Sequence, residues 1–140
     1  MRIVVDTNVF IGACLGVGAA NEVVRLCIEG RLTPLMGNAL YAEYEDILAR
    51  GTLFSKSRLS QSERDELFDI FASVSTWLRV YFQWRPNLRD EADNHLIELG
   101  VAGGASHIVT RNIRDVGSGE LAFPRLSIVT PEQFLKELNS

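Results

Sequence analysis

The chain has 140 residues, 46% of them hydrophobic, and its 14 Lys and Arg against 18 Asp and Glu give a formal net charge of −4. This length predicts one domain, 1–140, with enough apolar side chains for a sizeable core. The mild acidity argues against a protein that coats nucleic acid through bulk positive charge. It leaves open proteins whose excess of acids binds a metal ion.

Nothing in the sequence indicates a membrane or an oxidising compartment. No apolar run is long enough to span a bilayer, and the N-terminus reads as a strand rather than a leader peptide. Cys14 and Cys27 have neither the spacing nor the neighbours of a metal site. We expect them to be small buried side chains of a reduced, cytoplasmic protein.

The first predicted strand ends in a carboxylate. Ile3, Val4 and Val5 form a β-branched run without polar alternation, which predicts a strand buried on both faces of a parallel sheet. Asp6 follows directly, and ligands of open α/β sheets gather outside the carboxyl ends of the strands. Asp6 is therefore either a functional carboxylate or only the cap of the next helix.

Strands and helices alternate along the rest of the chain. Apolar periodicity and glycine stops predict helices at 21–30, 38–50, 61–74 and 90–102 and from 131, and strands at 32–36, 78–82, 107–110 and 126–129. Residues 51–60 predict a loop, and residues 111–120 a polar loop or a short helical turn. The alternation predicts βαβ units, and hence an α/β fold with a parallel sheet.

Several helix starts can be read from the sequence. Asn38 is expected to cap the helix at 38–50, Ser60 and Glu63 match a capping box, and Thr130 followed by Pro131 starts the last helix. The helix after the capping box is expected to bury the apolar stripe Leu67, Ile70, Phe71 and Val74.

Glu43 is the acid of the helix at 38–50 that is best placed to reach inward. At about 100° per residue, Leu40, Tyr44 and Leu48 share one side of this helix. Glu43 falls on the margin of that side, whereas Glu45 turns toward solvent. The alternative for Glu43 is an ordinary solvated helix face.

Asp90 and Asp93 have the i, i+3 spacing that puts two side chains on the same face of a helix. Both residues also suit the start of a helix, where acids favour the dipole. Asp93 lies one turn before Ile97, so it is expected to lean against packed structure. The two acids therefore either belong to a functional site or only cap the helix, and both alternatives stay open.

Thr110 ends the strand at 107–110 as Asp6 ends the first strand. If these strands are neighbours, Thr110, Asn112 and Asp115 approach Asp6, because the carboxyl ends of parallel strands share one edge. Capping of the following turn would explain Thr110 and Asn112 equally well.

Together these residues predict carboxylates gathered at one edge of the sheet. Carboxylate oxygens with hydroxyl and amide neighbours suit Mg²⁺ or Mn²⁺, and such a cluster is costly without a cation. The chemistry that this kind of site serves is phosphodiester hydrolysis. The two histidines do not suggest a triad or a zinc site; we expect His95 on a helix surface and His107 in a strand.

Four motifs occur in a characteristic order. They lie at 4–10 (VVDTNVF), 42–50 (AEYEDILAR), 89–94 (RDEADN) and 108–115 (IVTRNIRD), followed by a last match at 129–135 (VTPEQFL). In these motifs the chain resembles the PIN-domain family over nearly its whole length, and in particular the toxin-like, VapC-type bacterial members.

The resemblance implies a three-layer α/β/α sandwich with a parallel sheet of about five strands. It also implies a metal-dependent endoribonuclease that hydrolyses RNA and is the toxin of a toxin–antitoxin pair. Asp6, Glu43 and Asp93 match the family's catalytic acids, which hold Mg²⁺ or Mn²⁺, and Asp90 matches a supporting acid.

Thr7 and Asn8 match the residues that orient the first acid, and Thr110 matches the hydroxyl beside the metal. The chain departs from the family at Asn112, where many members carry a fourth acid. Asp115 is the nearest substitute and is expected to reach the metal, through water.

Partners follow from the same resemblance. Arg111 and Arg114 are expected to contact RNA phosphates, with a solvated loop as the alternative. A protein antitoxin is expected to block the site. A homodimer is also expected, because relatives commonly pair and because apolar side chains are expected at the surface: Leu53, Phe54, Leu59, Trp77 and Trp84.

Two other functions compete with this prediction. A PIN fold that has lost activity could serve as an RNA- or protein-binding module, and Asn112 favours that alternative. A receiver-type domain phosphorylated on aspartate would need a Lys at a late strand end, where this chain has Thr110 and Thr130.

Overall fold

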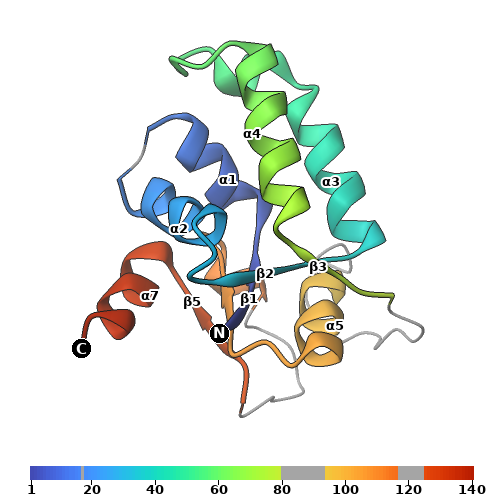
Figure 1. Ribbon diagram of the computed structural model, residues 1–140, viewed down its shortest axis with the longest axis vertical. Helices are drawn as coiled ribbons and strands as arrows, with labels where there is room; N and C mark the ends of the chain where they lie inside the picture. The colour runs from blue at the N-terminus through green and yellow to red at the C-terminus, as the bar shows by residue number, and fades with distance from the viewer. Residues whose placement is uncertain (17, 80–93, 117–124) are drawn as a thin grey trace.

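The computed structural model describes residues 1–16, 18–79, 94–116 and 125–140. Its strands form a five-stranded sheet in the order β3-β2-β1-β4-β5, and every neighbouring pair runs parallel. The predicted parallel sheet of about five strands is therefore confirmed, with the first strand at its centre (Figure 1). The strands are β1 (Arg2–Val5), β2 (Thr33–Met36), β3 (Thr76–Trp77), β4 (His107–Val109) and β5 (Ser127–Val129).

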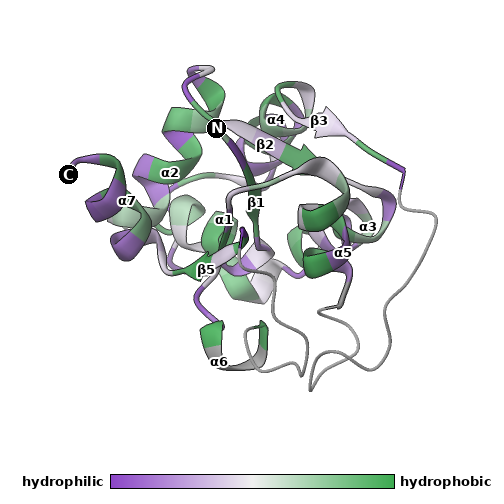
Figure 2. Ribbon diagram, turned by 90° about the horizontal axis from the view of Figure 1, so that it is seen from below, coloured by the Kyte–Doolittle hydropathy of each residue, from purple (hydrophilic) through white to green (hydrophobic). Residues whose placement is uncertain are grey.

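Helices cover the sheet on both sides, which confirms the three-layer α/β/α architecture. Figure 2 shows α1, α2 and α7 on one side of the sheet and α5 on the other. The helices α3 and α4 lie side by side and project beyond the sheet (Figure 1). The helices are α1 (Thr7–Cys14), α2 (Gly18–Ile28), α3 (Asn38–Leu48), η1 (Gly51–Phe54, a 3₁₀ turn), α4 (Gln61–Ser73), α5 (Asn94–Gly103), α6 (Ile113–Val116) and α7 (Pro131–Leu138).

The central strand sets the edge at which polar side chains meet. Ile3, Val4 and Val5 are at most 1% exposed, as expected of a β-branched strand covered on both faces. Val5 pairs with Val109 of β4, so Asp6 and Thr110 follow their strands at the same edge. The backbone N–H of Asp6 continues the ladder by donating to the Val109 carbonyl at 3.0 Å.

Tyr44 attaches α3 to the central strand. Its hydroxyl donates a hydrogen bond of 2.8 Å to the Val5 carbonyl, and the side chain is 1% exposed. The ring stands edge-on to Phe10 of α1 at 5.4 Å and stacks on Phe68 of α4 at 5.0 Å. These aromatic contacts hold α1, α3 and α4 together around the end of β1.

Two predicted helix starts are confirmed by their hydrogen bonds. Ser60 and Glu63 form the capping box of α4, and each bonds the backbone N–H of the other. Thr130 caps α7 in the same way, with Pro131 at the first helical position. Each cap satisfies backbone donors that the first turn of a helix leaves free.

The helix α3 begins at residue 38 as predicted, but the predicted cap is wrong by one residue. The cap is Gly37, in an extended conformation and without a side-chain hydrogen bond, and Asn38 is already helical. A Cβ at position 37 would lie 3.3 Å from the Leu99 side chain. Because α5 packs this closely, glycine, which has no Cβ, fits the cap position of α3.

The stripe predicted for α4 is also wrong in part. Phe68 and Phe71 are buried, whereas Ile70 is 41% exposed. Phe68 is buried because its ring stacks on Tyr44. The side of α4 that faces the core is therefore rotated about the helix axis relative to the prediction. Arg64 of the same helix is buried and lies 4.4 Å from the centre of the Phe54 ring.

The strand predicted at 78–82 lies earlier in the chain. β3 comprises Thr76 and Trp77, because these residues pair with Leu35 and Met36 of β2. Leu78 follows the strand, and 80–82 lie outside the described residues. The start of the helix predicted at 90–102 also lies outside them, and α5 is described from Asn94.

The expected exposed apolar surface is only partly present. Trp77 is 48% and Leu53 is 41% exposed, but Phe54 is 3% exposed because it packs beneath Arg64. Leu59 is half-buried, and the remaining predicted residue of this set, Trp84, lies outside the described residues.

Cys14 and Cys27 are free and buried, as expected. Burial raises the pKa of the Cys14 thiol to about 11 and that of Cys27 to about 12.

In the described ranges, no single helix has the length and apolar character to cross a membrane; α1 and α2 together meet those two criteria only as a sharply bent pair.

Replacing Tyr44 by Phe tests the attachment of α3 to β1. The Val5 carbonyl would lose its donor inside the core, so we expect the free energy of unfolding to fall by about 1–3 kcal/mol. Tyr41→Phe is the matched control, because no described residue bonds the Tyr41 hydroxyl, and it is expected to be near neutral. Urea unfolding measures both. Equal stability of the two variants would show that this hydrogen bond contributes little.

Candidate functional site

Asp6 is both a helix cap and a buried member of a polar cluster. As the N-cap of α1 it accepts a hydrogen bond from the Thr7 backbone N–H to Oδ1 at 2.7 Å. Its side chain is only 4% exposed, whereas aspartates are mostly exposed in folded proteins. The two interpretations of Asp6 in the sequence therefore do not exclude each other.

The second oxygen of Asp6 faces β4. Its Oδ2 accepts from the Thr110 hydroxyl at 2.7 Å and from the Asn8 side-chain amide at 3.2 Å. Asn8 is itself fixed, because its Oδ1 accepts from the Arg111 backbone N–H at 3.0 Å. Neighbouring parallel strands thus bring Asp6, Asn8 and Thr110 together.

Glu43 reaches this cluster from α3. Its Oε1 accepts from the Thr7 hydroxyl at 2.8 Å, and Thr7 is 4% exposed. Thr7 therefore contacts both acids: its backbone N–H bonds Asp6 and its hydroxyl bonds Glu43. The position of Glu43 on the margin of the apolar side of α3 permits this contact.

His95 completes the cluster, although we expected it on a helix surface. Its Nε2 lies 2.9 Å from Glu43 Oε2, and the His95 side chain is 18% exposed. Because an ionised carboxylate only accepts, Nε2 is the donor of this bond. The expectation was wrong because α5 packs against α3, a contact that the periodicity of α5 alone does not reveal.

The two acids differ in their electrostatic surroundings. Burial raises the pKa of Asp6, and the charge of Glu43 raises it further against the opposing hydrogen bond from Thr110. The hydrogen bond from His95 lowers the pKa of Glu43, with a further contribution from Thr7, against the effect of burial. In the described part of the chain, no Lys or Arg forms an ion pair with either acid.

Other predicted residues lie at the rim of the cluster or outside the described ranges. Asn112 is exposed, and its backbone N–H donates to the Thr110 hydroxyl at 2.9 Å. Arg111 forms an ion pair with Glu132 of α7. The structure places Arg114 and Asp115 in α6 without describing their side chains, and Asp90 and Asp93 lie outside the described residues.

The donor atoms of this cluster fit a hard divalent cation. Asp6 and Glu43 supply carboxylate oxygens, and Thr110 supplies a hydroxyl, the ligand types that Mg²⁺ and Mn²⁺ favour. Among the described residues, however, no three His, Cys, Asp or Glu side chains are arranged to hold a metal ion. A complete metal site would need an acid from outside this set, as the predicted roles of Asp90 and Asp93 require.

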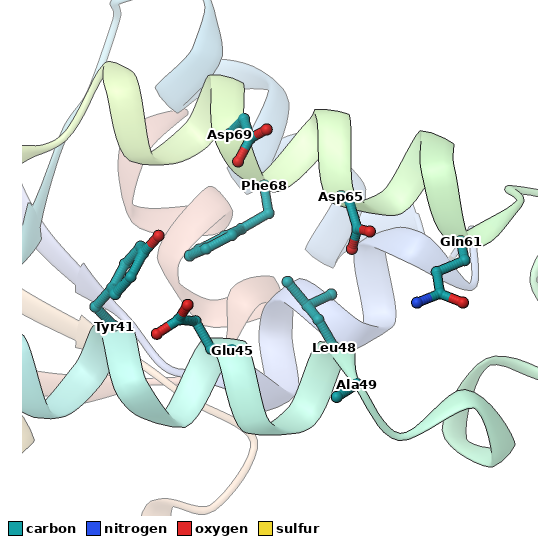
Figure 3. Close-up of a pocket in the computed structure, with 8 residues that line it drawn as sticks. All are labelled: Tyr41, Glu45, Leu48, Ala49, Gln61, Asp65, Phe68 and Asp69. Atoms are coloured by element: carbon teal, nitrogen blue, oxygen red, sulfur yellow. The ribbon is translucent and has the colours of Figure 1, made fainter.

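A separate groove of about 280 Å³ lies between α3 and α4 (Figure 3). The groove is lined by three acids, Glu45, Asp65 and Asp69, and by the aromatic side chains of Tyr41 and Phe68. Glu45 therefore belongs to this groove rather than to the cluster around Asp6. Its acidic lining is unsuited to the phosphates of a nucleic acid.

Comparisons with known proteins agree with this fold. No curated protein matches the chain. Among solved structures, the chain is similar to one in the crystal structure of VapBC2 from Rickettsia felis bound to a DNA fragment from their promoter. The TM-score is 0.57 at 15% sequence identity, and the match covers 91% of this chain and 97% of that one.

The model of the PIN domain family matches residues 2–114, which include β1, α3 and β4. The matched range contains Asp6, Glu43, His95 and Thr110, four of the side chains of the cluster just described. By this match over most of its length, the chain belongs to the PIN domain family.

Proposed function

We propose that the chain is a metal-dependent endoribonuclease that hydrolyses RNA phosphodiester bonds and is the toxin of a toxin–antitoxin pair. The observation that carries the proposal is the meeting of Asp6 and Glu43 through Thr7 at the carboxyl ends of the central strands. Membership of the PIN domain family supports nuclease chemistry. Two acids from separate elements, gathered without a Lys or Arg partner in the described ranges, support a site for a cation.

Asp6, Glu43 and Asp93 would hold Mg²⁺ or Mn²⁺, with Asp90 or Asp115 completing the site through water. When bound, the cation supplies an acidified water and stabilisation of the leaving oxygen. The protein's own part is to keep the carboxylates oriented. For Asp6 the orienting groups are Thr7, Asn8 and Thr110.

Arg111 and Arg114 would contact RNA phosphates. Arg111 follows Thr110 directly, and its backbone is bonded to Asn8, so it lies at the rim of the cluster. Its guanidinium now pairs with Glu132, an exposed partner that a phosphate would replace. Arg114 is one turn further along, in α6.

A protein antitoxin would bind this chain and block the site. The similarity to a chain of VapBC2 and the VapC-type motifs support such a partner. We also propose a homodimer, for which the exposed Trp77 and Leu53 offer apolar surface. The buried free thiols Cys14 and Cys27 suit a reducing cytoplasm.

A catalytically weakened PIN-fold module that binds RNA or protein is the second candidate. The observation that favours it is Asn112, which stands where many members carry an acid and whose side chain is exposed. An asparagine brings no charge to a cation. Cleavage by the parent protein separates the two candidates, because a binding module would retain RNA without cutting it.

Neutralising the acids tests the proposed activity. Asp6→Asn, Glu43→Gln and Asp93→Asn are each expected to lower Mn²⁺-dependent RNA cleavage at least about 100-fold, because a lost ligand should exceed the 10–100-fold cost of a lost outer partner. Mn²⁺ is expected to raise the melting temperature of the parent but not of these variants.

Glu45→Gln is the matched control for these acids. It removes a carboxylate from the same helix as Glu43, but from the groove side, and is expected to cleave like the parent. Folded Asp6→Asn and Glu43→Gln proteins with parental cleavage rates would overturn the proposed function.

Asp115 and Asn112 can be separated by metal titration. If Asp115 supplies the remaining charge through water, Asp115→Asn is expected to weaken Mn²⁺ binding more than Asn112→Ala does. Asn112→Asp is expected to tighten it by adding a carboxylate at the position where many members of the family carry an acid. Calorimetry of the three variants beside the parent measures this. The opposite order, with parental affinity in Asp115→Asn, would give the fourth position to Asn112.

A further inference from the structure

Glu43 is held at both of its carboxylate oxygens by groups from different helices. Thr7 of α1 donates to Oε1 at 2.8 Å, and His95 of α5 contacts Oε2 at 2.9 Å. The Glu43 side chain is 30% exposed, so burial alone would not fix it. A glutamate has several rotatable bonds, and two donors on opposite oxygens restrict them to one arrangement.

His95 is not explained as part of the apolar packing of α5. Its Nδ1 is buried and has no hydrogen-bond partner among the described residues. This fits an imidazole that carries its proton on Nε2, because the free Nδ1 then has no hydrogen to satisfy. The only hydrogen bond of the imidazole among the described residues is therefore the one that Nε2 donates to Glu43 Oε2.

We propose that His95 is a positioning residue of the metal site: its Nε2–H fixes the carboxylate of Glu43 in the orientation that meets the cation. This inference rests on the proposed function. Hydrogen-bond partners of ligating groups orient those groups and tune the affinity for the metal. Asp6 is oriented by Thr7, Asn8 and Thr110. His95 orients Oε2 of Glu43 in the same way.

Two substitutions of similar size separate hydrogen bonding from packing. His95→Leu removes the donor, whereas His95→Gln keeps an N–H near the position of Nε2. In calorimetric titrations with Mn²⁺ alone, His95→Leu is expected to bind roughly 10-fold more weakly than the parent, and His95→Gln to recover most of that loss. In a Glu43→Gln background, His95→Leu is expected to cause no further loss.

The other histidine is the matched control. His107 contacts Ser106 at 2.7 Å and Glu137 at 3.4 Å, away from Glu43, and His107→Leu is expected to leave the affinity for Mn²⁺ unchanged. Circular dichroism checks that each variant is folded. If His95→Leu does not fold, His95→Asn replaces it, because its shorter side chain places no donor at the Nε2 position.

A folded His95→Leu or His95→Asn protein that binds Mn²⁺ like the parent would overturn the positioning role while leaving the proposed function intact. Equal loss in His95→Gln and His95→Leu would also overturn it, since packing would then explain both. A parent protein that binds no Mn²⁺ would overturn the proposed function itself, and the positioning role with it.

Discussion

Two short hydrogen bonds made by Thr7 are the constraint on which the candidate site depends. Its backbone N–H bonds Asp6 at 2.7 Å and its hydroxyl bonds Glu43 at 2.8 Å, so one residue sets the relative position of two acids. Thr7 can do this because it is the first residue of α1 and is buried at the end of β1. The arrangement of the acids therefore follows from the point at which the central strand gives way to a helix.

The surrounding fold supports this junction from both sides. Tyr44 ties α3 to the Val5 carbonyl, directly before Asp6, and Thr110 joins Asp6 from the neighbouring strand. These contacts bring the carboxylates of Asp6 and Glu43 together at the end of β1, where burial already raises the pKa of Asp6. Stability alone does not require two carboxylates there, and acids with shifted pKa values are typical of functional sites.

The part of this arrangement that could be predicted from sequence follows from regular geometry. Parallel pairing puts Asp6 and Thr110 at one edge whenever β1 and β4 are neighbours, and the register Val5 to Val109 does so here. The helical period places Glu43 beside the apolar side of α3. The second argument needs only the repeat of one helix, and the first needs only that the two strands are neighbours.

The features that could not be predicted depend on contacts between elements. His95 was missed because the period of α5 says nothing about its packing on α3, although a histidine two residues after a predicted catalytic acid was a signal. Phe68 replaces Ile70 in the core because it stacks on Tyr44. β3 is placed by its pairing with β2 rather than by the aromatic run that follows Trp77.

The most direct test of a cation at this junction is a crystal structure of the protein soaked in Mn²⁺, with anomalous data that locate the ion. The account predicts an anomalous peak at about 2.0–2.6 Å from carboxylate oxygens of both Asp6 and Glu43. Crystals of Asp6→Asn would lack that peak. Mn²⁺ bound only elsewhere, for example at the acids lining the groove between α3 and α4, would contradict the account.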